Sequence, residues 1–277
     1  MKPAAFDYVR ARSLDEALAA LASGGDDAKP IAGGQSLVPA MNMRLVRPAL
    51  LVDLNHAGLG GITVDGGMRI GATARQAELA RDGRAHPLVR QALPFVGHFV
   101  TRNRGTVGGS IAHADGAAEL PLCLAVLDGV VVAQGPGGRR EVGAADFFVT
   151  HFLTTLETGE LVVETVWPLA AEGETSAFEE LALRTGDFAQ SMTAVVLRWD
   201  AGVVTDARVG VGAVTDRPTR LPEVEQLLVG ATGADAAADA GALAARLVDP
   251  PSTIHASAAY LRALTGTLVT RAVERAS

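Results

Sequence analysis

Residues 102–115 read RNRGTVGGSIAHAD, and this glycine-rich stretch decides how the rest of the chain is interpreted. Glycine lacks Cβ and tolerates positive φ, so consecutive backbone N–H groups around a glycine pair can point at one anion. Thr106 and Ser110 can add hydroxyl donors. Because a helix is predicted over residues 87–100, we interpret residues 104–109 as an anion-binding loop that follows it.

A second segment of the same kind, AGGQSL, occupies residues 32–37 and follows a strand predicted over residues 30–32. Two such loops facing each other would cradle a diphosphate through neutral dipoles, with no need for a lysine. Taken singly, each loop is more typical of an ordinary turn. The chain contains neither G-x-x-x-x-G-K-[ST] nor G-x-G-x-x-G, so it is neither a P-loop nucleotidase nor an ordinary Rossmann dehydrogenase.

The overall composition excludes several classes of protein. The 277 residues are 48% hydrophobic and 20% charged, which is enough for a folded core, and the net charge of −7 disfavours nucleic acid. The single cysteine, Cys123, can hold neither an internal disulfide nor an iron–sulfur cluster, and we expect it to be a small buried side chain. No signal peptide is evident, and the longest apolar stretch, residues 120–133, is interrupted by Asp128. These features predict a cytoplasmic protein without a transmembrane segment.

The pattern of apolar residues and caps predicts a small βαβ-type unit in the first ~55 residues. Its helix begins after Ser13, which acts as N-cap with Glu16 reaching back to complete a capping box, and it ends at Gly24-Gly25. A compact apolar run at residues 50–54 predicts a buried strand.

Two further units follow along the chain. Residues 168–175 are a plausible linker, and the region after it reads as a separate α+β domain of about 100 residues. Residues 230–245 are rich in Ala, Gly and Asp and fit either a helix or a loose loop. In the middle unit we expect strands at residues 68–72, 129–133 and 161–167 and a helix at 76–80, and in the last unit strands at 194–199 and 209–214 and helices at 221–229 and 255–273.

Three motifs in one order make a family resemblance specific. Residues 32–37, followed by Leu51-Val52-Asp53-Leu54, resemble the first FAD loop of the flavin-binding medium subunit of carbon monoxide dehydrogenase, xanthine dehydrogenase and related molybdenum hydroxylases. Residues 102–115 are similar to its second loop, and residues 183–189, LRTGDFA, to a motif of its C-terminal domain. The resemblance covers essentially the whole chain.

The resemblance implies a fold of the α+β class. It comprises an FAD-binding domain of the PCMH (vanillyl-alcohol oxidase-like) type, made of two α/β subdomains at residues 1–57 and 58–170. A C-terminal α+β domain with an antiparallel sheet, of the carbon monoxide dehydrogenase flavoprotein type, would occupy residues 175–277.

The resemblance also implies the residues that contact FAD. The backbone of both glycine loops would hold the pyrophosphate, and Asp115 or Glu119 would bind ribose or ribityl hydroxyls; a helix N-terminal charge explains Glu119 equally well. Val96 and Val162 match apolar positions at the flavin, although plain core packing would also explain them. No catalytic side chain and no metal site are expected. The implied contacts are Pro30, Ile31, Ala32, Gly33, Gly34, Gln35, Ser36, Leu37, Val96, Thr106, Val107, Gly108, Gly109, Ser110, Asp115, Glu119 and Val162.

Several charged residues near these motifs have open roles. Arg102 and Arg104 either stabilise loop carbonyls, reach a partner's surface or are simply solvated, and His113 is expected to be a structural loop histidine. Asn42 stands where many relatives carry a lysine, and Glu179 falls near a position that in xanthine-oxidising relatives is a lysine touching the flavin. The electron acceptor therefore stays open between NAD⁺, dioxygen and a quinone or carrier protein.

The function that the resemblance implies is electron relay. A molybdenum-cofactor large subunit would act on the substrate, a small subunit would carry [2Fe–2S] clusters, and this chain would pass electrons through FAD, in a dimer of heterotrimers. The substrate belongs to another chain and cannot be read here. Two alternatives remain at this point: a stand-alone flavin oxidoreductase of the same FAD-binding superfamily, and a non-catalytic assembly module whose glycine loops are turns.

Overall fold

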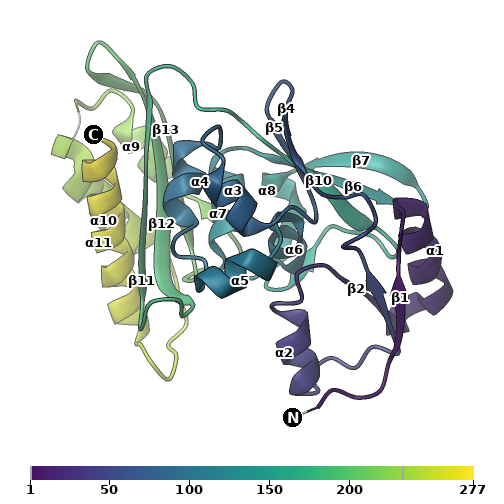
Figure 1. Cartoon of the computed structure of the whole chain (residues 1–277). Helices are drawn as coiled ribbons and strands as arrows, with labels where there is room; N and C mark the ends of the chain where they lie inside the picture. Colours follow the sequence, from purple (N-terminus) through teal and green to yellow (C-terminus); the bar gives the residue numbers. More distant parts are fainter. Residues whose placement is uncertain (1, 233) are drawn as a thin grey trace.

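A small parallel sheet begins the chain. The computed structural model describes residues 2–232 and 234–277, and its first sheet has the order β1-β3-β2 (Figure 1). Helix α1 joins the outer two strands, so the predicted βαβ-type unit is present, but β1 and α2 were not predicted. The elements are β1 (Asp7–Arg10), α1 (Leu14–Gly24), the 3-10 helix η1 (Gly25–Asp27), β2 (Ala28–Ile31), α2 (Leu37–Asn42) and β3 (Leu50–Asp53).

Helix α1 begins where its cap residues predict. The Ser13 hydroxyl accepts a hydrogen bond from the Glu16 N–H at 3.1 Å. The second half of the predicted capping box is wrong, because the Glu16 carboxylate accepts from the N–H of Arg12 at 2.8 Å. The following strand, β2, starts two residues earlier than expected, since Ala28 already pairs with Leu50 of β3.

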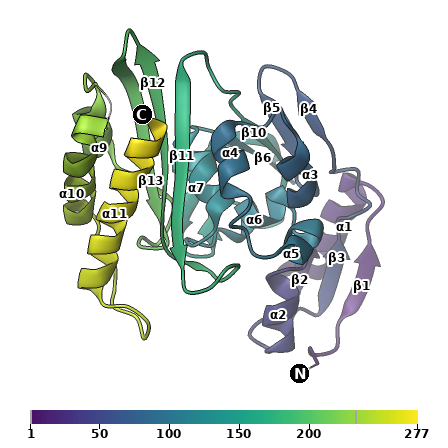
Figure 2. The ribbon, with the colours of Figure 1, turned by 60° about the vertical axis from the view of Figure 1, so that its left-hand side comes forward.

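The second unit is an antiparallel sheet with the order β4-β5-β10-β6-β7, and its helices lie between it and the C-terminal domain (Figure 2). Its strands are β4 (Ile62–Val64), β5 (Met68–Gly71), β6 (Val130–Gly135), β7 (Gly138–Gly143) and β10 (Leu161–Trp167), with a separate hairpin of β8 (Phe148–Thr150) and β9 (Leu153–Thr154). Its helices are α3 (Gln76–Arg81), α4 (Pro87–Ala92), α5 (Phe99–Arg104), α6 (Val107–His113), α7 (Glu119–Val126) and α8 (Ala144–Phe147).

The single helix predicted over residues 87–100 is wrong. Helix α4 ends at Ala92 and α5 begins only at Phe99. Pro94 cannot donate the helical hydrogen bond, and Gly97 takes a left-handed φ of +47° that breaks the helix. The loop predicted over residues 104–109 is correspondingly short, because α6 already starts at Val107.

The C-terminal domain is an antiparallel sheet with the order β11-β12-β13-β14, as predicted in kind. Helices α10 and α11 cover one face, while α4 and α7 pack on the other side (Figure 2). Strand β11 was not predicted, and from Ala237 the ambiguous stretch 230–245 is helical; residue 233 lies outside the described residues. The elements are β11 (Glu174–Ala182), β12 (Ala189–Asp200), β13 (Val203–Gly212), β14 (Thr219–Arg220), α9 (Pro222–Leu228), η2 (Ala234–Ala236), α10 (Ala237–Leu247) and α11 (Ala258–Ala276).

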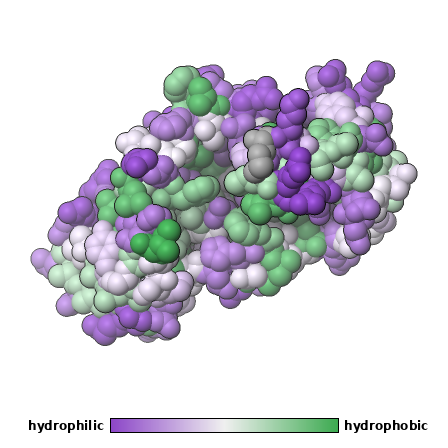
Figure 3. All heavy atoms as spheres, turned by 90° about the horizontal axis from the view of Figure 1, so that it is seen from below, coloured by the Kyte–Doolittle hydropathy of each residue, from purple (hydrophilic) through white to green (hydrophobic). Residues whose placement is uncertain are grey.

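Helix α7 is the central buried element. Every residue from Glu119 to Val126 is buried between the second sheet and the C-terminal sheet. Cys123 is fully buried there, as predicted, and burial raises the pKa of its thiol well above the ordinary value. Among residues 2–232 and 234–277 no helix combines the length and apolarity needed to cross a bilayer. On the face seen from below, apolar side chains form separate patches among hydrophilic ones (Figure 3).

Candidate functional site

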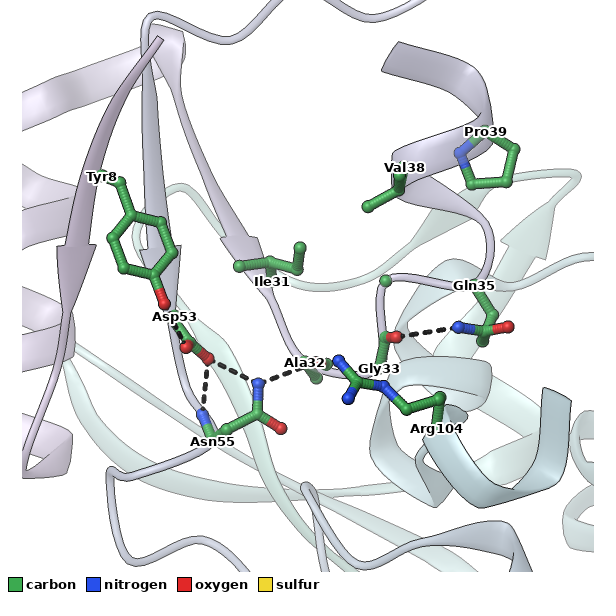
Figure 4. Close-up of a pocket in the computed structure, with 11 residues that line it drawn as sticks. Tyr8, Ile31, Ala32, Gly33, Gln35, Val38, Pro39, Asp53, Asn55 and Arg104 are labelled. Atoms are coloured by element: carbon green, nitrogen blue, oxygen red, sulfur yellow. Dashed lines mark hydrogen bonds between the residues drawn. The ribbon is translucent and has the colours of Figure 1, made fainter. Parts of the chain in front are cut away.

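A pocket of about 460 Å³ lies where the first sheet meets the two glycine loops (Figure 4). It brings together five of the predicted contact residues, 31–35, all from the end of β2 and the first loop. Its other lining residues were not among the predicted contacts. The full lining is Tyr8, Ile31, Ala32, Gly33, Gly34, Gln35, Val38, Pro39, Asp53, Asn55 and Arg104.

The first glycine loop presents unused backbone donors to this pocket. In the described part of the chain, no protein group accepts a hydrogen bond from the N–H of any residue from 33 to 37. Gly34 has a φ of +71°, a left-handed conformation that glycine adopts without a steric cost. The Gln35 side chain donates to the Gly33 carbonyl at 3.2 Å, so that carbonyl is occupied while the amides remain available. Successive free amides around a left-handed glycine form a concavity suited to an anion.

Two arginines in the last turn of helix α5 have different roles. The Arg102 guanidinium donates to the carbonyl oxygens of Val96 and Gly97 at 2.9 Å each, which is one of the roles considered from the sequence. Arg104 instead lines the pocket, and its guanidinium extends beside Ala32 and Gly33 (Figure 4). The free amides therefore have a cation next to them, which the sequence-based picture of purely neutral dipoles did not include.

The second glycine loop uses its amides within the protein. The N–H groups of residues 107–110 therefore have acceptors inside the protein, unlike those of the first loop, and the contact of these residues with the pyrophosphate stays a prediction. These groups donate as follows: Val107 to the Ala74 carbonyl at 3.0 Å, Gly108 to the Ala72 carbonyl at 3.0 Å, Gly109 to the Thr106 hydroxyl at 3.1 Å and Ser110 to the Thr106 carbonyl at 3.1 Å.

Gly108 is required by packing of helix α6 against the residues that follow β5. A Cβ at this position would lie 2.5 Å from the Ala72 Cα and 2.8 Å from the Ala72 carbonyl oxygen, and backbone cannot move aside cheaply. The absence of a side chain at Gly108 thus reflects a close backbone approach inside the fold.

The two loops do face each other, as expected. A Cβ on Gly33 would lie 2.4 Å from the Arg104 carbonyl oxygen and 2.8 Å from the Gly105 Cα. The loops therefore touch through backbone alone. This contact brings Arg104 of the second loop to the pocket of the first.

A polar wall on the sheet side of the pocket was missed from the sequence. The Tyr8 hydroxyl donates to the Asp53 carboxylate, which also accepts from the backbone and side-chain nitrogens of Asn55 (Figure 4). Burial alone would raise the pKa of Asp53, but these hydrogen bonds outweigh it and lower the pKa. The same bond to Asp53 raises the pKa of Tyr8. Asp53 could have been noticed, since it ends the predicted strand 50–54 next to the first loop; nothing near Tyr8 signals its role.

The remaining predicted contacts do not line the pocket. Val96 and Val162 are buried in the core of the second unit, at 9% and 4% exposure. The Asp115 carboxylate accepts from the N–H of Ala117 at 2.9 Å in a local turn. The residues that the pocket leaves out are Pro30, Ser36, Leu37, Val96, Thr106, Val107, Gly108, Gly109, Ser110, Asp115, Glu119 and Val162.

A buried carboxyl group, Glu119, and a half-buried one, Glu180, lie between the second unit and the C-terminal sheet. Burial raises the pKa of Glu119, the first residue of α7, to about 7; Asp115 adds to the effect, while its own N–H and Arg102 oppose it. Burial and the neighbouring Glu119 raise the pKa of Glu180 on β11 to about 8. Near pH 7 Glu119 is therefore protonated in about half of the molecules and Glu180 in most of them.

Glu179 faces away from this pair. Its carboxylate forms an ion pair with Arg275 of α11, on the helix-covered face of the C-terminal sheet. Adjacent residues of a strand point to opposite faces, so Glu180 rather than Glu179 faces the second unit.

His113 lies at the end of α6 rather than in a loop. Its ring packs on Phe152 with the ring centroids 4.9 Å apart. Burial lowers its pKa, and Asp115 opposes the shift. This packing supports a structural role, and the absence of a catalytic role stays a prediction.

The comparisons with known proteins agree over the whole chain. Residues 4–170 match the family model described as "FAD binding domain in molybdopterin dehydrogenase", and residues 176–276 match "CO dehydrogenase flavoprotein C-terminal domain".

Two curated relatives are similar over full length. The chain is 42% identical to the 6-hydroxypseudooxynicotine dehydrogenase complex subunit alpha of Paenarthrobacter nicotinovorans, covering 100% of this chain and 96% of that protein. It is 36% identical to the carbon monoxide dehydrogenase medium chain of Afipia carboxidovorans, covering 100% and 98%. Among solved structures, a chain of quinoline 2-oxidoreductase from Pseudomonas putida 86 superposes with a TM-score of 0.95 at 37% identity, covering 100% of this chain and 98% of that one.

Proposed function

The chain belongs to the family of FAD-binding medium subunits of molybdenum hydroxylases, and on this premise we propose that it relays electrons from the [2Fe–2S] clusters of a partner subunit through FAD to an external acceptor. One observation carries the FAD part of the proposal. Residues 33–35, whose amides have no acceptor in the described part of the chain, line one pocket together with Arg104, and this combination suits a diphosphate.

The residues present fit FAD in the following way. The amides of the first loop and Arg104 would hold the diphosphate, and the hydroxyl groups of Thr106 and Ser110 would add donors from the second loop. We retain Asp115 or Glu119 for the ribose or ribityl hydroxyls and Val96 and Val162 for the flavin as proposals. If Glu119 is protonated, as its raised pKa favours, it can donate a hydrogen bond as well as accept one.

Bound FAD supplies the redox chemistry, because a flavin can take up electrons and pass them on. The chain's own residues bind and position it. The amides and Arg104 fix the phosphate end, and the Tyr8–Asp53 pair forms a rigid polar wall beside it. We assign no acid–base side chain to the relay, and His113, packed on Phe152, is left without a chemical role.

The partners follow from the family. We propose that a large subunit with a molybdenum cofactor and a small subunit with [2Fe–2S] clusters assemble with this chain, in a dimer of heterotrimers. The relatives named above as a complex subunit and a medium chain support this division of labour. The single, fully buried Cys123 agrees with it, since it leaves the clusters to another chain.

We also propose the division into residues 1–57, 58–170 and 175–277. Three hydrophobic clusters support it, one mainly in the first sheet and α1, one around α7, and one between the C-terminal sheet and its helices. The cluster around α7 also includes Phe178, Met192, Ala194 and Val196 of the C-terminal sheet. A few side chains of β6 and β10 join the first cluster, so the first two units share part of their core.

The test is the flavin, iron and molybdenum content of the complex purified through a tag on this chain. We expect all three, with FAD released on denaturation. Flavin without metals would contradict the relay and favour a self-contained flavin oxidoreductase. Protein without flavin or metals that also fails to take up added FAD would contradict FAD binding and leave an assembly module.

A further inference from the structure

A continuous chain of hydrogen bonds connects the two glycine loops through side chains outside both. The Asn55 amide nitrogen donates to the Ala32 carbonyl at 2.9 Å, and the Asn55 side-chain oxygen accepts from the Arg75 guanidinium at 2.6 Å. The other guanidinium nitrogen of Arg75 donates to the Arg104 carbonyl at 2.6 Å. One carbonyl on each loop is thus tied to the other by two side chains.

Both linking side chains are held in place at their bases. Asp53 accepts from the Asn55 backbone N–H at 2.9 Å and from its side-chain nitrogen, and Tyr8 fixes Asp53 in turn. These acceptors orient the Asn55 amide, because only its nitrogen can donate to Ala32 and Asp53. Arg75 is the N-cap of α3, and its backbone N–H donates to the Glu78 carboxylate at 3.0 Å. Side chains anchored in this way lose little entropy when they bridge.

The link controls which way the loop peptides point. In a trans peptide the C=O and the following N–H point in opposite directions. Holding the Ala32 carbonyl on Asn55 therefore turns the Gly33 N–H away from Asn55. Holding the Gly33 carbonyl on the Gln35 side chain does the same for the Gly34 N–H. Without these bonds the loop carbonyls, which repel an anion, would be free to rotate toward the pocket.

We propose that Asn55 and Arg75 are positioning residues that lock the first glycine loop in its diphosphate-binding conformation by tying it to the second loop. The proposal deepens the FAD-binding role proposed above and rests on it. Arg75 acts through its two acceptors and is distinct in this from Arg104, which lines the pocket itself. Arg75 is half-buried, and its two terminal guanidinium nitrogens donate to two different acceptors. A lysine has a single terminal nitrogen and cannot reproduce this pair of hydrogen bonds.

The test compares Arg75→Met, Asn55→Leu and the double variant with Arg81→Met, a control at the exposed end of the same helix. FAD dissociation from the purified complex is followed by the rise in flavin fluorescence, and the unfolding temperature of FAD-depleted complex is measured beside it. We expect each single variant to release FAD roughly tenfold faster, the range of a lost hydrogen bond to a charged group. The double variant should be no faster than the singles, since breaking either link frees the loop.

The outcomes distinguish a positioning role from a role in stability alone. If a variant lowered the unfolding temperature without a matching change in the rate of FAD release, the two residues would serve stability alone, and the proposal would be overturned. Unchanged dissociation in Arg75→Met and Asn55→Leu, or effects that multiply in the double variant, would also overturn it. A wild-type complex that contains no FAD would instead refute the proposed function itself, so the two failures are distinguishable.

Discussion

The two glycine loops look alike in sequence and differ in what their backbone does. Residues 32–37 leave their amides free around a left-handed Gly34, next to the Arg104 guanidinium. Residues 107–110 form the start of helix α6, and their amides are used by carbonyl and hydroxyl groups of the protein. A glycine pair therefore marks a place where backbone comes close to something. In the first loop the fold leaves room for an anion, and in the second the neighbour is Ala72.

The largest expected effect tests the packing role of the second loop. Gly108→Val should lower the unfolding free energy of the FAD-free protein by at least about 3 kcal/mol, the upper end of ordinary overpacking, because its Cβ would meet the Ala72 backbone at 2.5 Å. Thermal and urea unfolding measure this. The matched variant Gly33→Val should lose FAD with a smaller loss of stability, since Gly33 is half-buried and the nearest group its Cβ would meet belongs to the exposed Arg104.

Retained stability in Gly108→Val, combined with loss of FAD, would contradict this account. That result would indicate that the amides of the second loop also bind the phosphate, so that the two loops have the same role.

The next prediction concerns the left-handed residue of the first loop. Gly34→Ala should weaken FAD binding roughly tenfold, because a left-handed conformation costs a residue with Cβ about 1–2 kcal/mol and the loop would relax out of it. Titration of FAD-depleted complex with FAD gives the affinity. Gly66→Ala is the control: it has a similar φ of +64°, in a turn where a Cβ would meet nothing, so FAD affinity should be unchanged. Equal affinities for the two variants would argue against the first loop as the anion site.

A smaller effect is expected at the cap of the second loop. Thr106→Ala removes the hydroxyl that accepts from the Gly109 N–H and should lower stability by about 1 kcal/mol, the usual cost of a lost N-cap. Thr106→Ser keeps the hydroxyl and should retain most of the stability. Urea unfolding measures both variants. If Thr106→Ala were as stable as the wild type, the Gly109 amide would not depend on this cap.

The last prediction concerns the pH dependence of stability that is set by two acidic residues, Glu119 and Glu180. Unfolded glutamates titrate near 4.5, whereas the pKa of Glu119 is raised to about 7 and that of Glu180 to about 8. Raised acid pKa values favour the folded state most at low pH, and this contribution is lost as the pH rises from the unfolded toward the folded pKa. Glu180→Gln should therefore flatten the decline of stability between about pH 4.5 and about pH 8.

Unfolding temperatures across that pH range test the prediction, with Glu179→Gln as control. Glu179 faces α11 and pairs with Arg275, so its replacement should leave the pH slope as it is. A slope that Glu180→Gln does not change would show that Glu180 is ionised in the folded protein.

Local signals predicted much of this fold. The Ser13 cap and the βαβ-type first unit follow from caps and apolar patterns that span a few residues, whereas the antiparallel C-terminal sheet was implied by the family resemblance. The sequence also signals the break between α4 and α5, because Pro94 and Gly97 both disfavour a helix. The apolar pattern of residues 87–100 alone predicts one continuous helix.

The details of the site depend on contacts between distant residues. Tyr8 reaches Asp53 across 45 positions, and Arg75 reaches the Arg104 carbonyl across 29. No local pattern encodes these pairs. In the same way, the sequence shows a glycine pair at 108–109 but cannot show that the Ala72 carbonyl occupies the first of its amides.

Amide hydrogen exchange at residue resolution, on the complex with and without FAD, tests the difference between the loops most directly. The account predicts that the amides of residues 107–110 are protected even without FAD, because they are already hydrogen-bonded, while those of residues 33–37 exchange rapidly and become protected when FAD is added. Protection that appears with FAD at residues 107–110 and never at residues 33–37 would contradict it.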